Sequence, residues 1–331
     1  MTEPLLSVRG LTVEFPTRRG VLTAVNNVSF DIMPGEVLGV VGESGAGKSM
    51  TGSAIIGLIE RPGRIAAGEI RLQGERIDGI SPSAMRTVRG RRIGMIFQDP
   101  LTSLNPLYRI SDQIVETIRT HLPISLAEAR RRAIGLLDDV GIPDAERRID
   151  DYPHQFSGGM RQRVVIALAL CAEPDLVIAD EPTTALDVSV QAQIIDVMKR
   201  ICADRGAAIM LITHDMGVIA ETANRVAVLY AGRVVEIGPV RDVIKDARHP
   251  YSVGLMGAIP KLGGDAERLT QIPGSMPRLS AIPQGCAFNP RCERVFDRCR
   301  VERPEPIAVA PQREVACWLY DEPRSDGRAH A

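Results

Sequence analysis

The chain has 331 residues, of which 44% are hydrophobic and 24% are charged, enough for one large globular domain with a smaller one beside it. Its formal net charge of −1 argues against a nucleic-acid partner, which a basic surface would attract. The longest apolar run, at 164–172, is far below the ~20 residues of a membrane span, and the first residues lack a signal-peptide core. We expect a cytoplasmic protein that reaches a membrane only through partner subunits.

Two segments with alternating apolar and polar residues open the chain, at 5–15 and 22–32. The turn residues between them predict a β-hairpin or a β-meander. Phe15 lies at the end of the first segment, and its ring either packs in the core or offers a face on which adenine can stack. The pattern alone favours the core.

A glycine-rich loop at Gly42–Ser49 is the feature around which the other motifs are arranged. It matches G-x-x-x-x-G-K-[ST]. The apolar run at 36–41 predicts a buried parallel strand before the loop, and residues 50–59 can form a helix after it. In that context the backbone N–H groups surround phosphate oxygens, Lys48 reaches the β- and γ-phosphates, and Ser49 binds Mg²⁺. The alternative, a chance match in a glycine-rich turn, is disfavoured by the flanking pattern.

The next segments alternate between predicted strands and a short helix. Residues 68–77 predict a strand, and Ser81 before a proline predicts the cap of a helix that extends to about residue 88. An apolar strand at 93–97 then ends in Gln98 before an Asp-Pro pair. A glutamine at the end of a buried strand points into a cleft or a loop; the alternative is an ordinary polar strand end.

From residue 101 to about 172 the pattern becomes helical, which predicts a helical insertion in an α/β domain. Ser125–Glu128 is a capping box, and the glycine and proline at 141–143 end the helix that follows it. Further on, Ser157 precedes two glycines, Gly158 and Gly159, at the start of an apolar helix. Such a start can bind an anion, although Ser-Gly-Gly is also common in linkers.

Two later strands end in residues suited to phosphate chemistry. Leu176–Asp180 is apolar and ends at Asp180, which is placed to hold Mg²⁺, and Glu181 can accept a proton from a water that attacks the γ-phosphate. A charged strand end is the alternative. The strand at 207–212 ends near His214. Because the carboxyl ends of parallel strands share one edge of a sheet, we expect His214 to be functional. A last hairpin is predicted at 226–237.

In this order the motifs resemble those of the ATP-binding subunits of ABC transporters, over about residues 5–240. The signature motif at 156–160 departs from the family at Phe156 and Met160. The resemblance implies an α/β P-loop ATPase core with a β-subdomain and a helical subdomain at about 99–172, all within a nucleotide-binding domain at 1–237. It also implies catalytic roles for Glu181, His214 and Gln98, and Mg²⁺ ligation by Ser49, Gln98 and Asp180. For Phe15 it implies stacking on adenine, which reverses the preference for the core that the pattern alone gives. The other ATP contacts that it implies come from Gly42, Glu43, Ser44, Gly45, Ala46, Gly47, Lys48, Ser49, Met50, Ser157, Gly158, Gly159 and Asp187.

At three places the sequence resembles the D-type ATPase of dipeptide and oligopeptide permeases: the methionine at position 160, residues 99–106, and His249-Pro250-Tyr251. This branch implies ATP hydrolysis that energises peptide uptake at the cytoplasmic face of a bacterial inner membrane. The implied partners are two transmembrane permease subunits, a second ATPase subunit of the F-type, and indirectly a solute-binding protein. A homodimer is the alternative to the F-type heterodimer. One ATP would lie between Lys48 of one subunit and Ser157 of the other.

The tail at 238–331 is rich in proline and turn residues and contains four of the six cysteines. Cys286, Cys292, Cys299 and Cys317 are spaced C-x₅-C-x₆-C-x₁₇-C, without the paired C-x₂₋₄-C of structural zinc sites. Disulfides are disfavoured in a reducing cytosol. The spacing alone favours metal binding, and it leaves free thiols as the alternative. The resemblance implies a [4Fe–4S] cluster in a C-terminal extension, with zinc as the fallback and a structural or redox-sensing role.

Two other functions fit parts of the sequence. One is an ABC importer ATPase for nickel or another small solute, because the cassette does not contact the solute. The other is a DNA-associated ABC ATPase, which the single cassette and the lack of basic excess disfavour. Cys171 and Cys202 lie in apolar, helix-like stretches and are predicted to be core residues.

Overall fold

The computed structural model describes residues 3–183, 188–257 and 272–321. Its centre is an eight-stranded sheet in the order β11-β12-β10-β9-β3-β8-β7-β6, in which β9, β3, β8, β7 and β6 run parallel. These runs are short and apolar on both faces, as buried parallel strands require. The strands are β3 Val37–Val41, β6 Ile93–Ile96, β7 Leu176–Asp180, β8 Ala208–Ile212, β9 Arg225–Tyr230, β10 Arg233–Pro239, β11 Ile307–Ala310 and β12 Arg313–Val315.

A second, four-stranded antiparallel sheet is built from the N-terminal part of the chain, in the order β2-β1-β4-β5. β1 Leu6–Thr17 and β2 Gly20–Ile32 form the predicted hairpin. The single strand predicted at 68–77 is wrong: β4 Arg64–Leu72 turns back into β5 Glu75–Arg76. Gln73 and Gly74 make this turn with φ angles of 49° and 78°, a backbone conformation in which a strand cannot continue.

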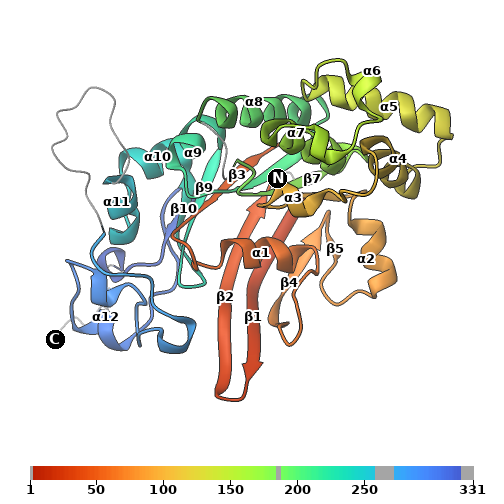
Figure 1. The fold of residues 1–331 in the computed structure, drawn as a ribbon. Helices are drawn as coiled ribbons and strands as arrows, with labels where there is room; N and C mark the ends of the chain where they lie inside the picture. The colour runs from red at the N-terminus through yellow and green to blue at the C-terminus, as the bar shows by residue number, and fades with distance from the viewer. Residues whose placement is uncertain (1–2, 184–187, 258–271, 322–331) are drawn as a thin grey trace, which may run out of the picture.

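The central sheet is covered on both faces (Figure 1). Along β7 the side chains alternate between two cores: Val177 and Ala179 pack with the helices of one face, and Leu176 and Ile178 pack with the other. The first core includes residues of α7 Gly158–Leu170, α8 Val188–Asp204 and α9 Met216–Thr222. The second includes α1 Lys48–Ile55 and the antiparallel sheet. α1 therefore shares one core with both sheets.

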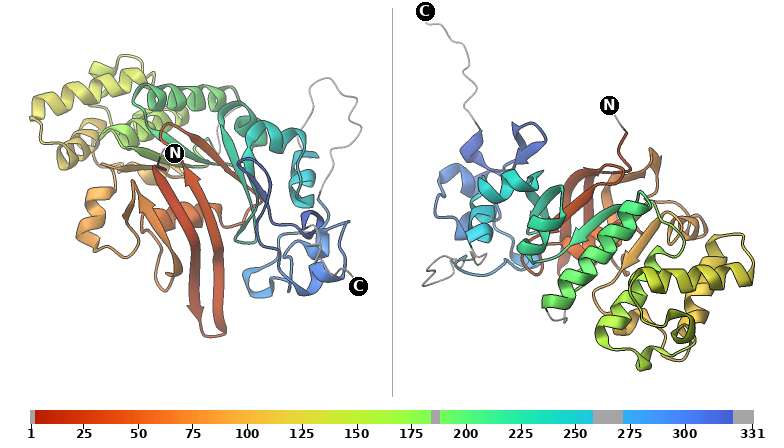
Figure 2. Two further views of the ribbon diagram at one scale, coloured as in Figure 1. Left: turned by 180° about the vertical axis from the view of Figure 1, so that it is seen from behind. Right: turned by 90° about the horizontal axis from the view of Figure 1, so that it is seen from above.

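The segment predicted to be helical does form helices. After α2 Pro82–Val88, capped by the predicted Ser81, it contains α3 Pro100–Ser103, α4 Ile110–His121, α5 Leu126–Asp139, α6 Ala145–Arg148 and α7. The Ser125 hydroxyl accepts the Glu128 N–H at 3.2 Å, and the Ser157 hydroxyl accepts the Met160 N–H at 3.3 Å, so both serines satisfy N–H groups at a helix start. Figure 2 places this insertion and the C-terminal part of the chain at opposite ends of the molecule.

The C-terminal extension, defined here as the described residues from 240 onward, is made of short pieces. They are α10 Val240–Lys245, α11 Pro250–Gly257, α12 Asp297–Val301 and the β11–β12 hairpin, with single 3₁₀ turns at Leu279–Ala281, Asn289–Arg291 and Trp318–Tyr320. β12 pairs with β10, joining Glu236 to Val315. The extension thus continues the central sheet across the boundary predicted at 237, and the division into two domains remains a prediction.

A buried ion pair lies where the extension meets the sheet. Arg313 donates to the Glu236 carboxylate at 2.8 Å, and both side chains are almost fully buried. The same carboxylate accepts the backbone N–H groups of Arg248 and His249. These bonds pair the buried charges, as buried ions require, and they fix the start of α11. None of the helices in the described ranges is long and apolar enough to cross a membrane.

Candidate functional site

The motif residues gather at the carboxyl edge of the parallel strands, as the sequence predicts. β3 runs into the glycine-rich loop, β7 ends at Asp180 and Glu181, and β8 leads to His214. Because β3, β8 and β7 are in-register parallel neighbours, their carboxyl ends lie side by side. This edge is the usual ligand site of an open α/β sheet.

The glycine-rich loop turns sharply between β3 and α1. Gly42, Gly45 and Gly47 have φ angles of 153°, 83° and 99°, and a Cβ on Gly42 would lie 2.3 Å from the Leu229 carbonyl oxygen. Only glycine allows this path. The Lys48 side chain is buried, and its ammonium group donates to the carbonyl oxygens of Gly42 at 2.8 Å and Glu43 at 3.2 Å. The loop is therefore closed around its lysine, with the N-terminus of α1 at its base.

Burial shifts the pKa values of the two charged groups at the base of the loop. It lowers the pKa of Lys48, and the carboxylates of Glu181, Asp180 and Glu43 oppose that shift. It raises the pKa of Asp180, which the hydrogen bond from Ser49 opposes. The Ser49 hydroxyl donates to Asp180 Oδ1 at 2.9 Å. Two oxygen ligands thus lie together, and they are of the kind that Mg²⁺ prefers.

The carboxylate of Glu181 is held between two polar side chains. Gln98 Nε2 donates to Oε2 at 2.9 Å, and His214 Nδ1 lies 3.4 Å from Oε1. The Glu181 backbone has a φ of 46°, and its N–H donates to the Ile212 carbonyl oxygen. This conformation is uncommon for a glutamate. An aimed carboxylate of this kind can accept a proton from a bound water.

Other predicted site residues lie apart from this edge or outside the described residues. Phe15 is half-buried against the second core, so its position fits either of its two predicted roles. Ser157 is exposed at the start of α7, and within the described ranges no hydrogen bond joins it to the glycine-rich loop. Met160 packs against the first core. Asp187 falls outside the described residues.

The structure adds neighbours to the loop that the sequence did not predict. The Glu43 N–H donates to the Tyr251 hydroxyl at 2.8 Å, and the Glu43 carboxylate forms an ion pair with Arg291 at 3.0 Å. Both partners come from the C-terminal extension. Tyr251 belongs to a motif noted in the sequence, but a contact between residues 208 positions apart leaves no local signal.

The four cysteines of the tail line one small cavity in the extension, together with His249 and Asn289. Burial raises the pKa of Cys317 to about 11, and the thiols of Cys286, Cys292 and Cys299 add to that shift. The four cysteine side chains of the tail, which are far apart in sequence, are therefore neighbours in space. Cys171 and Cys202 are buried in the first core, as predicted.

The cysteine cavity does not have the geometry of a mononuclear metal site. Among the described residues, no group of three or more His, Cys, Asp or Glu side chains is placed to hold a metal ion. The zinc fallback therefore finds no support in this geometry, because structural zinc needs four ligands at about 2.0–2.3 Å. The [4Fe–4S] cluster stays a prediction.

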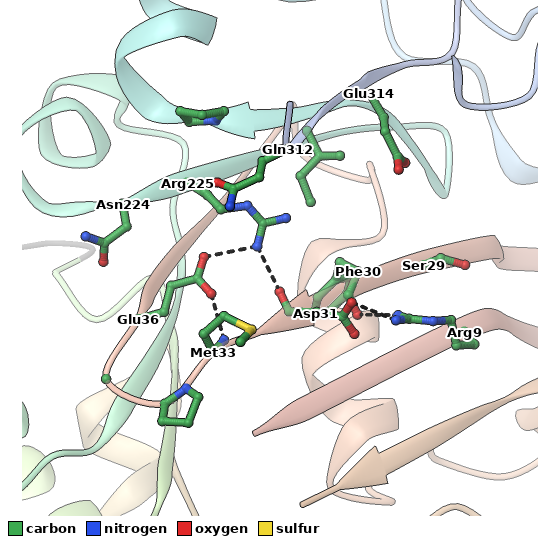
Figure 3. A pocket seen from close by; sticks show the side chains of 14 residues that line it. Arg9, Ser29, Phe30, Asp31, Met33, Glu36, Asn224, Arg225, Gln312 and Glu314 are labelled. Carbon is green, nitrogen blue, oxygen red and sulfur yellow. Dashed lines mark hydrogen bonds and ion pairs between the residues drawn. The ribbon is translucent and has the colours of Figure 1, made fainter. Parts of the chain in front are cut away.

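A cavity of about 830 Å³ lies at the opposite edge of the sheet (Figure 3). Arg225 is one of the residues that line it; its guanidinium pairs with the Glu36 carboxylate at 3.1 Å and donates to the Asp31 carbonyl oxygen at 3.2 Å. It is lined at the amino ends of β3 and β9 and by the β11–β12 hairpin, and it contains none of the motif residues. This cavity is therefore separate from the glycine-rich loop.

Comparison with known proteins identifies the family. The ABC transporter family matches residues 25–184, and the C-terminal region of oligopeptide/dipeptide transporters matches residues 235–299. The dipeptide transport ATP-binding protein DppD of Escherichia coli is 46% identical over 313 residues, which cover 95% of this chain and 96% of DppD. The chain belongs to the ABC transporter ATP-binding proteins. It is accordingly an ATPase, with the ABC cassette fold.

Two further proteins extend this comparison of the ABC ATPase. The oligopeptide transport ATP-binding protein OppD of Mycobacterium tuberculosis is 49% identical over 316 residues, which cover 95% of this chain and 52% of OppD. The solved structure of the ATP-binding cassette MJ0796, a dimer in a post-hydrolysis state with ADP and Pi, matches with a TM-score of 0.64 and 27% identity. That match covers 71% of this chain and 99% of MJ0796.

Proposed function

We propose that this ATPase energises the import of dipeptides or oligopeptides through partner membrane subunits. The observation that carries the proposal is the likeness to a dipeptide transport protein along nearly the whole chain, including the extension that matches oligopeptide/dipeptide transporters. The test is a transporter reconstituted in vesicles with its permease and solute-binding proteins. Dipeptide-stimulated ATP hydrolysis supports the proposal. Stimulation by nickel alone would overturn it in favour of a metal importer.

In this proposal the glycine-rich loop, Gly42–Ser49 with Met50, binds the phosphates of ATP. Lys48 would neutralise the β- and γ-phosphates. Ser49, Asp180 and Gln98 would ligate Mg²⁺, which would supply positive charge next to the transferred phosphoryl group. The contact between Ser49 and Asp180 supports this set. Glu181 is the general base, His214 orients it and the γ-phosphate, and Phe15 stacks on adenine.

A complete site needs a second ATPase subunit, in our proposal an F-type partner. Its signature motif would supply the groups equivalent to Ser157, Gly158 and Gly159, and Asp187 would lie near the shared boundary. The exposed cap at Ser157 supports this arrangement, since the N-terminus of a helix favours the binding of an anion. The dimeric state of MJ0796 gives a precedent for paired cassettes.

Ser157→Arg is expected to lower ATP hydrolysis by the assembled complex about a hundredfold, because a bulky cation replaces a phosphate donor used only in the closed site. ATP binding by the isolated chain should change less than about twofold. The matched control is Ser125→Arg, which removes another exposed serine cap in the same insertion. Equal losses of ATP hydrolysis in both variants would show that Ser157 acts only as a helix cap and not as a phosphate donor.

The remaining partners follow from the same proposal. Two permease subunits would contact the helical insertion, and a solute-binding protein would deliver the peptide on the other side of the membrane. The ATPase would then lie at the cytoplasmic face of the inner membrane as a peripheral subunit. Co-purification of the chain with both permeases from membranes tests this, and recovery of the chain without them would contradict it.

We also propose that Cys286, Cys292, Cys299 and Cys317 hold a [4Fe–4S] cluster. The cavity that the four cysteines line together supports this proposal. When bound, the cluster would join four segments of an extension whose elements are too short to build a core of their own. The four thiols would be deprotonated on binding.

Cys299→Ser is expected to abolish the visible absorbance of the cluster and to lower bound iron from about four atoms per chain to nearly none. The matched control, Cys202→Ser, replaces a buried cysteine outside the cavity and should keep its iron. Elemental analysis of anaerobically purified protein provides the measurement. Wild-type protein that is colourless and free of iron would contradict the cluster.

A further inference from the structure

Glu43, the second residue of the glycine-rich loop, is held by the C-terminal extension through two independent contacts. Its backbone N–H donates to the Tyr251 hydroxyl at 2.8 Å, and its carboxylate lies 3.0 Å from the Arg291 guanidinium. These partners are 208 and 248 residues away along the chain. The extension is therefore in direct contact with the loop in which we place the phosphates.

Arg291 is also held in place by contacts other than its ion pair with Glu43. Its side chain is only 7% exposed, and its Nε donates to the Pro273 carbonyl oxygen at 2.7 Å. The guanidinium carbon lies 5.8 Å from the ring centroids of both Tyr230 and Phe288, within the range of cation–π attraction. A guanidinium held on several sides loses little freedom when it pairs with a carboxylate.

The charge of Glu43 makes this pair important for ATP. A triphosphate is strongly anionic, and a carboxylate in the loop that surrounds it repels it. Arg291 neutralises that carboxylate in a pair whose side chains are 7% and 29% exposed, so that water screens it only in part. We propose that Arg291 and Tyr251 are positioning residues for ATP binding: they cancel the charge of Glu43 and fix the path of the loop. This inference depends on the proposed role of the loop.

The two contacts also connect the loop with the cysteine cavity. Arg291 immediately precedes Cys292, and Tyr251 follows His249 by two residues; Cys292 and His249 both line the cavity. The Tyr251 N–H donates to His249 Nδ1 at 3.1 Å, and the His249 ring is fully buried. A change in the packing of the cavity would move both residues that hold Glu43. The extension therefore sets the affinity of the loop for nucleotide.

The test measures ATP binding by the full-length chain. Arg291→Met should raise the Kd for ATP about fivefold or more, within the usual range of coupling between protein sites, and raise KM for ATP while kcat stays within about twofold. Adding Glu43→Gln to Arg291→Met should restore most of the affinity, because the unpaired carboxylate is then gone. A merely structural role for Arg291 would give no such rescue.

Arg233→Met is the matched control. Arg233 also pairs with a carboxylate of the extension, Glu305, at 3.0 Å, but it does not touch the glycine-rich loop. The Kd of the Arg233→Met variant for ATP should stay at the wild-type value. Tyr251→Phe keeps the ring and removes only the hydroxyl, so it should fold and weaken ATP binding about threefold, somewhat below the usual range of coupling between sites.

The outcomes separate this inference from the proposed function. Wild-type protein that does not bind ATP would overturn the role of the loop itself. Normal ATP binding by both folded Arg291→Met and folded Tyr251→Phe would overturn the inference and leave the ATPase untouched. Cys299→Ser should shift the Kd for ATP in the same direction as Arg291→Met; an unchanged Kd would show that the cavity does not act on the loop.

Discussion

Glu181→Gln is expected to lower the turnover of ATP about a hundredfold or more, the usual contribution of a positioned general base, while ATP binding persists. The glutamine amide has almost the same shape as the carboxylate and can still contact Gln98 and His214. It cannot accept a proton from the attacking water. Bound ATP should therefore accumulate instead of being hydrolysed.

The geometry around Glu181 is the reason to expect a specific loss. The side chain is 16% exposed and approached from two sides, by Gln98 at 2.9 Å and His214 at 3.4 Å. Its backbone is fixed in the left-handed region by the bond to Ile212, a strained conformation of the kind that occurs at functional sites. The amide variant keeps this frame, so the change isolates the proton transfer.

The measurement is the single-turnover rate of ATP hydrolysis, with nucleotide occupancy measured in parallel. Glu173→Gln provides the matched control, because Glu173 precedes the other end of β7 and pairs there with Arg132. Its hydrolysis rate should be that of the wild-type protein. Hydrolysis at the wild-type rate by Glu181→Gln would show that another group, or the phosphate itself, accepts the proton.

The carboxyl edge of the sheet was predictable because each strand carries its own signal. The strands β3, β7 and β8 are continuous apolar runs, and each is followed at once by polar residues: the glycine-rich loop, Glu181 and His214. A parallel arrangement then brings those residues to one edge whatever the order of the strands. The helix caps at Ser81, Ser125 and Ser157 were equally local, since a serine and its helix start are adjacent in sequence.

The features that were missed depend on contacts between distant segments. β12 pairs with β10 on one side and with β11 on the other, and a three-residue strand has no hydrophobic period to identify it. The pairing of Glu43 with Arg291 joins residues 248 positions apart. The turn at Gln73 and Gly74 has a local signal in the glycine. The apolar residues on both sides of it nevertheless led to the prediction of one longer strand.

Lys48→Ala is expected to weaken ATP binding about a hundredfold, since hydrogen bonds to charged groups contribute roughly 1.5–3 kcal/mol each and the lysine can make more than one. At present its buried ammonium group bonds to the carbonyl oxygens of Gly42 and Glu43. Burial already lowers its pKa, because the charged form has lost the water that would solvate it. The negative charge of a triphosphate would compensate for that lost solvation, which makes ATP binding and the charge of Lys48 mutually stabilising.

Calorimetric titration with Mg²⁺-ATP measures this loss, and the rise in Tm on adding ATP should disappear with it, because a ligand stabilises a fold only through the affinity it retains. Lys199→Ala is the matched control: its ammonium group also donates to a backbone carbonyl, that of Glu221 at 3.2 Å, but on α8, away from the loop. Its Kd should not change. Lys48→Ala protein that binds ATP with wild-type affinity would place the phosphates outside the glycine-rich loop.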